Sequence, residues 1–191
     1  IIKEGPSGRR KFIDLELCQL DKIYVYNLVN YNKALNQRNL LLKDLAVRPQ
    51  YMDTLDVWDE QLIRYGAVLI DLRKQFADEL APVVEAIHRR LTGERETLSL
   101  TYEPNASQEE FRHMLQKNRD RDIRQKSTQT GPHRDDIRFS VNGVDIRTYG
   151  SQGQQRTAAL SLKMAEIELV KKRTKDTPVL LLDDVLSELD A

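Results

Sequence analysis

Two long apolar stripes at helical spacing constrain the fold of this chain more than any other feature. The first runs from Leu20 to Leu45 and the second from Leu55 to Leu91, with apolar residues recurring in steps of three and four. Pro49 separates them, because the residue before a proline avoids helical geometry. The pattern predicts an antiparallel helical hairpin with arms roughly 40 to 55 Å long, at about 1.5 Å per residue.

The ends and irregularities of these helices can also be predicted. Asp53 or Thr54 can cap the second helix and Gly93 can end it, while Pro82 inside it predicts a bend. Arg38 interrupts the first stripe. Two interpretations remain: core helices of an all-α domain, or an arm that projects from a separate catalytic or binding domain. The aromatic residues on the stripes are predicted to be arm core: Tyr24, Tyr31, Trp58 and Tyr65.

Strand patterns appear only after Gly93. Residues 97–104 alternate as a strand does, Ser107 with Glu110 predicts a capped helix to about Lys126, and Asn142-Gly143 predicts a β-hairpin. A further helix follows, and Val179 to Leu182 is typical of a strand buried on both faces of a parallel sheet. The helix before this strand is expected to have the apolar face Ala158, Leu162, Ala165 and Leu169.

Two carboxylates follow the last predicted strand. Asp183 and Asp184 stand where open α/β sheets place their ligands. One carboxylate there suits Mg²⁺, and its neighbour could orient or deprotonate a water molecule. The alternative is that the two residues only begin a polar loop.

The segment TYGSQGQQRTAAL, residues 148–160, predicts a helix that opens directly after a glycine turn. Ser151 and Gln154 have the spacing of a capping box. Helix starts present free N–H groups and the positive end of the helix dipole, and Gly150 and Gly153 allow a phosphate close to the backbone. A plain capped helix is the alternative for this segment taken alone.

Composition limits the possible partners and compartments. The 191 residues carry 30 basic and 30 acidic side chains, so any nucleic-acid partner must be bound by a local patch. No apolar run approaches the roughly 20 residues needed to cross a bilayer. The single Cys18 is consistent with a cytoplasmic protein. His88 and His113 have no partner at metal-ligand spacing.

Several motifs together resemble the ABC-type ATPases of the SMC class, and within that class a family of bacterial recombination mediators. SQGQQR at 151–156 is similar to the ABC signature, VLLLDD at 179–184 to Walker B, and SELDA at 187–191 to the D-loop. GPHRDD at 131–136 resembles a motif of the mediator family, although its role is open. The resemblance covers about residues 130–191 at motif level, and the helical hairpin agrees with the family's arm in type and order.

The resemblance implies roles for these residues. In an ABC dimer the signature of one subunit closes over ATP bound by the other, which would place Ser151, Gln152, Gly153 and Gln154 against a γ-phosphate in trans. Asp183 would hold Mg²⁺. Asp184 would take the place of the usual catalytic glutamate, one methylene shorter, which leaves its full equivalence open. Ser187 and Asp190 of the D-loop would touch the opposite subunit, with Gln155 and Arg156 as helpers.

The resemblance further implies a mixed α/β (α+β) ATPase lobe fragment with a long antiparallel helical arm. Residues 1–18 would lead in from an N-terminal lobe, 19–128 would form the arm, and 129–191 would belong to the ATPase lobe. No G-x-x-x-x-G-K-[ST] loop occurs, so the sequence is expected to be an internal piece that is inactive alone. The full-length protein would be a weak, DNA-stimulated ATPase that forms an ATP-dependent homodimer and acts on duplex DNA and single-strand/double-strand junctions with RecO and RecR.

Basic clusters supply candidate DNA contacts. Lys117, Arg121 and Arg124 are predicted to share one helical face, although Asp120 and Asp122 interrupt the charge and a solvated helix is the alternative. Two other functional classes remain open. One is another SMC-like or OLD-type ATPase coupled to a nuclease or clamp, and the other is a non-enzymatic helical interaction module.

Overall fold

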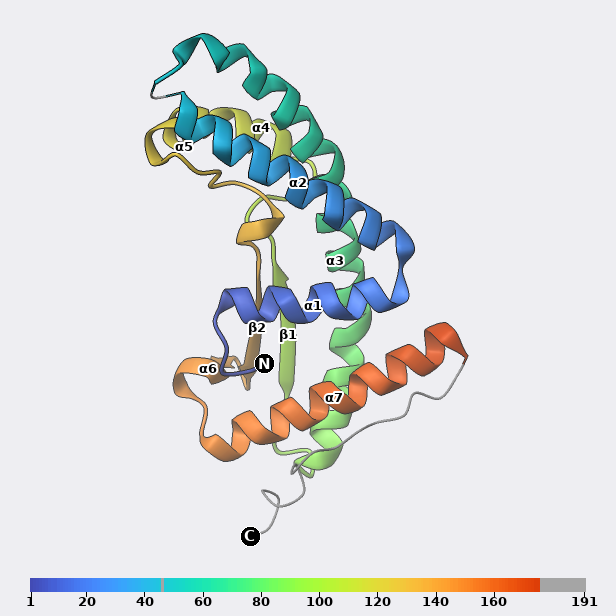
Figure 1. Cartoon of the computed structure of the whole chain (residues 1–191). Helices are drawn as coiled ribbons and strands as arrows, with labels where there is room; N and C mark the ends of the chain where they lie inside the picture. The colour runs from blue at the N-terminus through green and yellow to red at the C-terminus, as the bar shows by residue number, and fades with distance from the viewer. Residues whose placement is uncertain (46, 176–191) are drawn as a thin grey trace.

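The computed structural model describes residues 1–45 and 47–175. Figure 1 shows an elongated molecule with a helical arm at one end and a base at the other, and helix α3 runs through both. The arm contains α2 (Lys22–Asp44), η1 (Pro49–Thr54), most of α3 (Leu55–Leu91), α4 (Phe111–Lys117) and α5 (Arg119–Gln125). The base contains α1 (Pro6–Leu20), β1 (Leu98–Glu103), β2 (Asp136–Val141), β3 (Val144–Asp145), α6 (Ile146–Tyr149) and α7 (Gln152–Thr174).

The predicted helical hairpin is formed by α2 and α3. Helix α3 has 37 residues and spans about 55 Å. Thr54 occupies its N-cap position, but the expected side-chain cap is wrong, because the Thr54 hydroxyl donates to the Tyr51 carbonyl instead. Gly93 ends α3 as expected, with φ of 58° and a Glu94 N–H that donates back to the Arg89 carbonyl at 2.8 Å. Pro82 lies inside α3, which continues through it.

Helix α1 was not predicted. The first stripe indicated a helix from Leu20, whereas α1 ends at Leu20 and α2 begins at Lys22. The two helices are separate because Asp21 is extended, with φ of −141°, and its carboxylate caps α2 by accepting from the Ile23 N–H at 2.7 Å. Pro6 opens α1, which buries Phe12, Ile13 and Leu17.

The described sheet is antiparallel, in the order β1-β2-β3. Leu98 pairs with Val141 and Leu100 with Phe139, and all four side chains are buried. The predicted hairpin turn is confirmed: Asn142 and Gly143 have φ of 51° and 81°, as a type I′ turn requires. The parallel strand predicted at 179–182 lies outside the described residues.

The predicted helix from Ser107 to about Lys126 is two helices. The capping bonds between Ser107 and Glu110 exist, but α4 ends at Lys117 and α5 begins at Arg119. The break comes at Asn118, whose side-chain N–H donates to the Thr130 hydroxyl at 2.8 Å.

One apolar core runs from the base into the arm. It contains Tyr24 and Tyr31 as fully buried members, and Trp58 and Tyr65 pack against it, so the prediction of arm core for these aromatics is confirmed. The predicted face of α7 is also buried in this core: Ala158, Leu162, Ala165 and Leu169. Among residues 1–45 and 47–175, no helix is long and apolar enough to span a membrane.

Candidate functional site

The turn at Ser151 has the capping box that the sequence predicted. The Ser151 hydroxyl accepts from the Gln154 N–H at 3.1 Å, and the Gln154 side-chain oxygen accepts from the Ser151 N–H at 3.0 Å. Gly150 allows the chain to turn tightly from α6, because a Cβ there would lie 2.4 Å from the Ile146 carbonyl oxygen. The turn is therefore fixed at both ends while its residues 151–153 stay exposed.

This turn has the chemistry of an anion site. The N–H groups of Gln152 and Gly153 lie in the first turn of a 23-residue helix and have no intrahelical acceptor. The Ser151 oxygen already accepts from Gln154, so its hydroxyl hydrogen can donate to another group. A Cβ on Gly153 would meet only the Ser151 oxygen, at 3.9 Å, and Ser151, Gly153 and Gln154 line a cleft at this turn.

A chain of hydrogen bonds connects the turn to α3. The Gln154 side-chain N–H donates to Glu96 at 2.9 Å, and the other Glu96 oxygen lies 3.3 Å from His88 Nε2. His88 Nδ1 lies 2.9 Å from the Ser161 hydroxyl of α7. Burial lowers the pKa of His88, although the hydrogen bond and charge of Glu96 oppose that effect. Thus α3, the α3–β1 connection and α7 fix the position of Gln154, a relation that no local sequence spacing could reveal.

The remaining predicted site residues lie outside this turn or outside the described part of the chain. Asp183, Asp184, Ser187 and Asp190 lie outside the described residues. Gln155 contacts α6, where its side-chain N–H donates to the Ile146 carbonyl at 2.8 Å.

Lys117, Arg121 and Arg124 are exposed, but the single helical face predicted for them is wrong. The break at Asn118 places Lys117 on α4 and the two arginines on α5.

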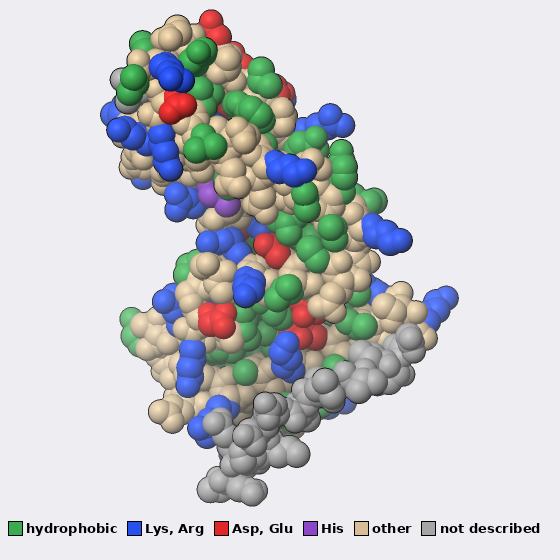
Figure 2. Space-filling view, viewed as in Figure 1, with side chains coloured by type: hydrophobic (Ala, Val, Ile, Leu, Met, Phe, Trp, Pro, Cys, Tyr) green, Lys and Arg blue, Asp and Glu red, His purple; other side chains and the backbone are tan. Residues whose placement is uncertain are grey.

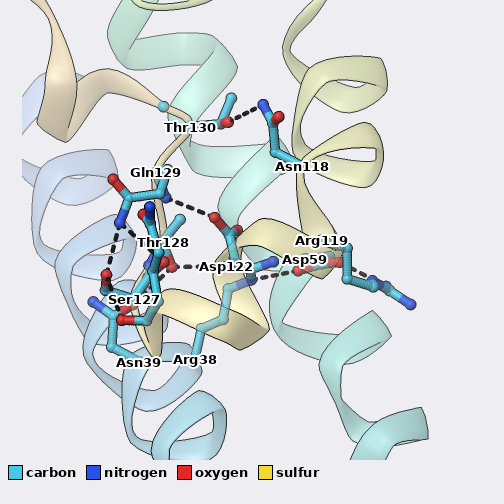
Figure 3. Close-up of polar contacts among 12 residues, drawn as sticks. Arg38, Asn39, Asp59, Asn118, Arg119, Asp122, Ser127, Thr128, Gln129 and Thr130 are labelled. Atoms are coloured by element: carbon cyan, nitrogen blue, oxygen red, sulfur yellow. Dashed lines mark hydrogen bonds and ion pairs between the residues drawn. The ribbon is translucent and has the colours of Figure 1, made fainter.

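Arg38, which interrupts the first apolar stripe, lies in a buried cluster of charged residues (Figure 3). Arg38 is 0% exposed, and its Nε donates to Asp59 at 2.6 Å while its Nη1 donates to Asp122 at 2.7 Å. Asp59 also accepts from Arg119 at 2.6 Å, and Asp122 accepts from the Gln129 N–H at 2.9 Å. The cluster joins α2, α3 and α5, so it holds the basic helix α5 against the hairpin.

The GPHRDD segment forms the neck between arm and base. Asp135 is 1% exposed and accepts from Arg73 Nη1 at 2.9 Å, from the Tyr102 hydroxyl and from the Asn105 N–H. Burial raises the pKa of Asp135 despite the opposing charge of Arg73. Asp136 accepts hydrogen bonds from both Nε and Nη2 of Arg9, each at 2.7 Å, in a bidentate ion pair. The two aspartates thus connect α1, α3 and the sheet.

His133 of the same segment contacts the arm. Its Nδ1 lies 2.7 Å from the Tyr31 hydroxyl of α2, and its Nε2 lies 2.9 Å from the Thr128 carbonyl. Because the Thr128 carbonyl can only accept, the proton of the neutral ring belongs on Nε2 and Tyr31 donates to Nδ1. Burial lowers the pKa of His133 to about 4 from the ordinary 6.5.

This shift predicts an acid sensitivity of the neck. The pKa of His133 is lower in the folded state than in the unfolded state, so protonation favours unfolding. The full stability is therefore present above pH 6.5 and is lost as the pH falls toward about 4. We expect His133→Gln to be less stable than wild type at pH 7. Between pH 7 and pH 4, its free energy of unfolding should fall by about 2 to 3 kcal/mol less than that of wild type. Urea denaturation at the two pH values measures this difference. Exposed His113→Gln is the control, and an equal loss in both variants would contradict the prediction.

Comparisons with known proteins agree with this geometry. No protein-family model matches the chain. It is 58% identical over 190 residues to the DNA replication and repair protein RecF of Lachnoclostridium phytofermentans, and 61% identical to that of Agathobacter rectalis, in each case over 100% of this chain. A solved structure of the recombination mediator protein RecF with ATP, in the RecFOR pathway, superposes with a TM-score of 0.94 at 41% identity over 100% of this chain. Over its whole length the chain is similar to RecF proteins.

RecF similarity confirms the fold class, a mixed structure of helices and a small antiparallel sheet. The chain spans about half the length of the curated relatives, 53% and 52% for the two named above. It covers 53% of the solved RecF–ATP chain, and the same share of a second solved structure, RecF-ATPrS. The similarity favours the mediator interpretation over a nuclease-coupled ATPase or a purely helical interaction module.

Proposed function

We propose that this chain works within an ATP-dependent RecF-type recombination mediator that acts on gapped or junction DNA together with RecO and RecR. The chain would contribute the arm and the signature motif, while ATP and Mg²⁺ bind to the full-length protein. Residues 19–128 would form the arm, with 129–191 in the ATPase lobe. The supporting observation is the turn at Ser151, a rigid helix start with exposed donors and open backbone, in a chain 41% identical to a RecF solved with ATP.

The proposed role of the turn is to bind the γ-phosphate of ATP held by a second subunit. The N–H groups of Gln152 and Gly153 and the Ser151 hydroxyl would donate to phosphate oxygens, and the α7 dipole would favour the negative charge. Gln154 would keep the turn in place through Glu96. ATP would then hold two subunits together, and its hydrolysis would release them, which is suited to a slow, switch-like ATPase.

Three further roles are proposed from the family resemblance. Asp183 would bind Mg²⁺, whose chemistry is to neutralise and orient phosphate oxygens. Asp184 would orient the attacking water. Ser187 and Asp190 would contact the partner subunit.

Gly153→Glu tests the signature role without unfolding the helix. The new side chain has open space, replaces a residue of poor helix propensity, and adds a negative charge where the helix dipole favours it. It would nevertheless repel a phosphate. We expect the ATP-dependent dimerisation of the full-length protein to weaken at least about tenfold, or 1.4 kcal/mol, with no loss of thermal stability.

Sedimentation velocity with and without ATP measures the effect. The control is Gln37→Glu, which adds the same charge at an exposed position of α2. If Gly153→Glu dimerises with ATP as the control does, the signature role is wrong.

A further inference from the structure

Exposed basic side chains continue from the arm to the base on one face of the molecule. Figure 2 shows Lys and Arg side chains at the arm end and again beside the constriction between arm and base. We name this set the basic track. It consists of Arg121, Arg124 and Lys126 at α5, Arg134 in the neck, and Arg10 and Lys11 in α1; all are exposed except Arg10, which is half-buried.

Hydrogen bonds and a shared cleft connect the parts of the basic track. Lys126 directly follows α5, and three residues later the Gln129 side-chain oxygen accepts from Arg134 Nη2 at 3.2 Å. Arg134 is adjacent to His133, which lines a cleft of about 410 Å³ together with Arg10 and Lys11. The neck segment 128–134 thus links the end of α5 to the cleft at α1.

The nearby carboxylates do not cancel this charge, because most of them are turned inward. Asp122 of α5 is 0% exposed and bound to Arg38, and Asp135 is bound to Arg73. Asp14 is the acidic residue lining the cleft, and it accepts from Arg73 Nη2 at 2.7 Å. Asp120 remains exposed on α5. Of the two aspartates that interrupt the basic charge in the sequence, only Asp120 therefore lies on the surface of α5.

Arg10 has a particular position in the cleft. Its Nη1 donates to the Asp135 carbonyl at 2.7 Å, and among residues 1–45 and 47–175 its other guanidinium N–H groups have no partner. Burial and the positive charge of Arg73 lower the pKa of Arg10, although three aspartates oppose the effect. The cleft is lined by the cations Arg10, Lys11 and Arg73 and by one carboxylate, Asp14, an excess of positive charge that an anion would relieve.

We propose that the basic track is a binding surface for the sugar–phosphate backbone of DNA, with one phosphate seated in the cleft at Arg10 and Lys11. This inference rests on the DNA binding proposed for the full-length protein and specifies where that binding occurs. Arginine and lysine at several places along an exposed surface neutralise successive phosphates, and they contact no base edges, so binding here would not depend on DNA sequence.

The test is a salt titration of duplex DNA binding by the full-length protein with ATP, followed by fluorescence anisotropy. The track variant carries Lys11→Gln and Arg134→Gln, both exposed residues of the constriction. The control carries Lys171→Gln and Lys172→Gln, exposed residues of α7 outside the track. For the track variant we expect about tenfold weaker binding and a slope of log K against log salt smaller by about 2, because each phosphate contact contributes about 1. The control should keep the wild-type slope.

Two outcomes would overturn the inference, and they are distinguishable. If wild type binds DNA and the track variant keeps the same affinity and slope as the control, the surface is wrong but the proposed function stands. If wild type itself does not bind DNA in the presence of ATP, the proposed function fails as well. Thermal melting of both variants within a few degrees of wild type shows that the loss is not one of folding.

Discussion

Asp122→Ala is expected to lower the free energy of unfolding by about 3 to 5 kcal/mol. Removal of this carboxylate leaves Arg38, which is 0% exposed, with one charged partner instead of two in the interior of the arm. It also removes the acceptor of the Gln129 N–H. Arg38 and Arg119 would then share the single carboxylate of Asp59, which leaves one positive charge in excess. Such a buried charge costs more than the ion pair contributes, because water cannot reach it.

Asp120→Ala is the matched control for this experiment. Asp120 has the same charge, lies two residues away on α5, and is exposed, so its loss should change stability by less than about 0.5 kcal/mol. Urea denaturation of the two variants gives the comparison. Equal stabilities would show that the Arg38 cluster does not hold α5 against the hairpin.

Gly131→Ala is the second substitution with a large expected effect. Gly131 has φ of 132° and ψ of −179°, a region that essentially only glycine adopts. A Cβ there would also lie 2.5 Å from the Tyr31 hydroxyl and 3.0 Å from the Phe111 ring. Strain and overpacking together should cost about 3 kcal/mol or more, because both neighbours are buried and cannot move aside easily.

Gly93→Ala separates strain from packing. Gly93 also has a positive φ, 58°, but a Cβ there would meet nothing within 4 Å. Its substitution should cost only about 1 kcal/mol. Thermal or urea unfolding can rank the two, and a Gly131→Ala variant no less stable than Gly93→Ala would contradict the packing described for the neck.

Local patterns were sufficient for much of the fold. The steps of three and four predicted α2 and α3, Asn142-Gly143 predicted the hairpin turn, and Ser151 with Gln154 predicted the start of α7. Each depends on residues a few positions apart, where propensity and capping act. The resemblance carried by residues 130–191 also agrees with the RecF proteins to which the whole chain is similar.

Long-range electrostatics could not be predicted in this way. Arg38 interrupts an apolar stripe, and only its partners Asp59 and Asp122, 21 and 84 residues away, make its burial favourable. At the break between α4 and α5, the Asn118 side chain likewise bonds to Thr130, 12 residues away. Glu96 belongs to no sequence motif, and its contacts with Gln154 and His88 form only where α3 and α7 meet.

The most direct test of the central claim mixes two full-length subunits, one carrying Gly153→Glu and one disabled in nucleotide binding. If the signature acts in trans, neither subunit should dimerise with ATP alone, whereas the mixture should form a heterodimer, because the first supplies bound ATP and the second an intact Ser151 turn. Sedimentation velocity of the mixture with ATP measures this directly. A Gly153→Glu subunit that dimerises alone, or a mixture that stays monomeric, would contradict the account.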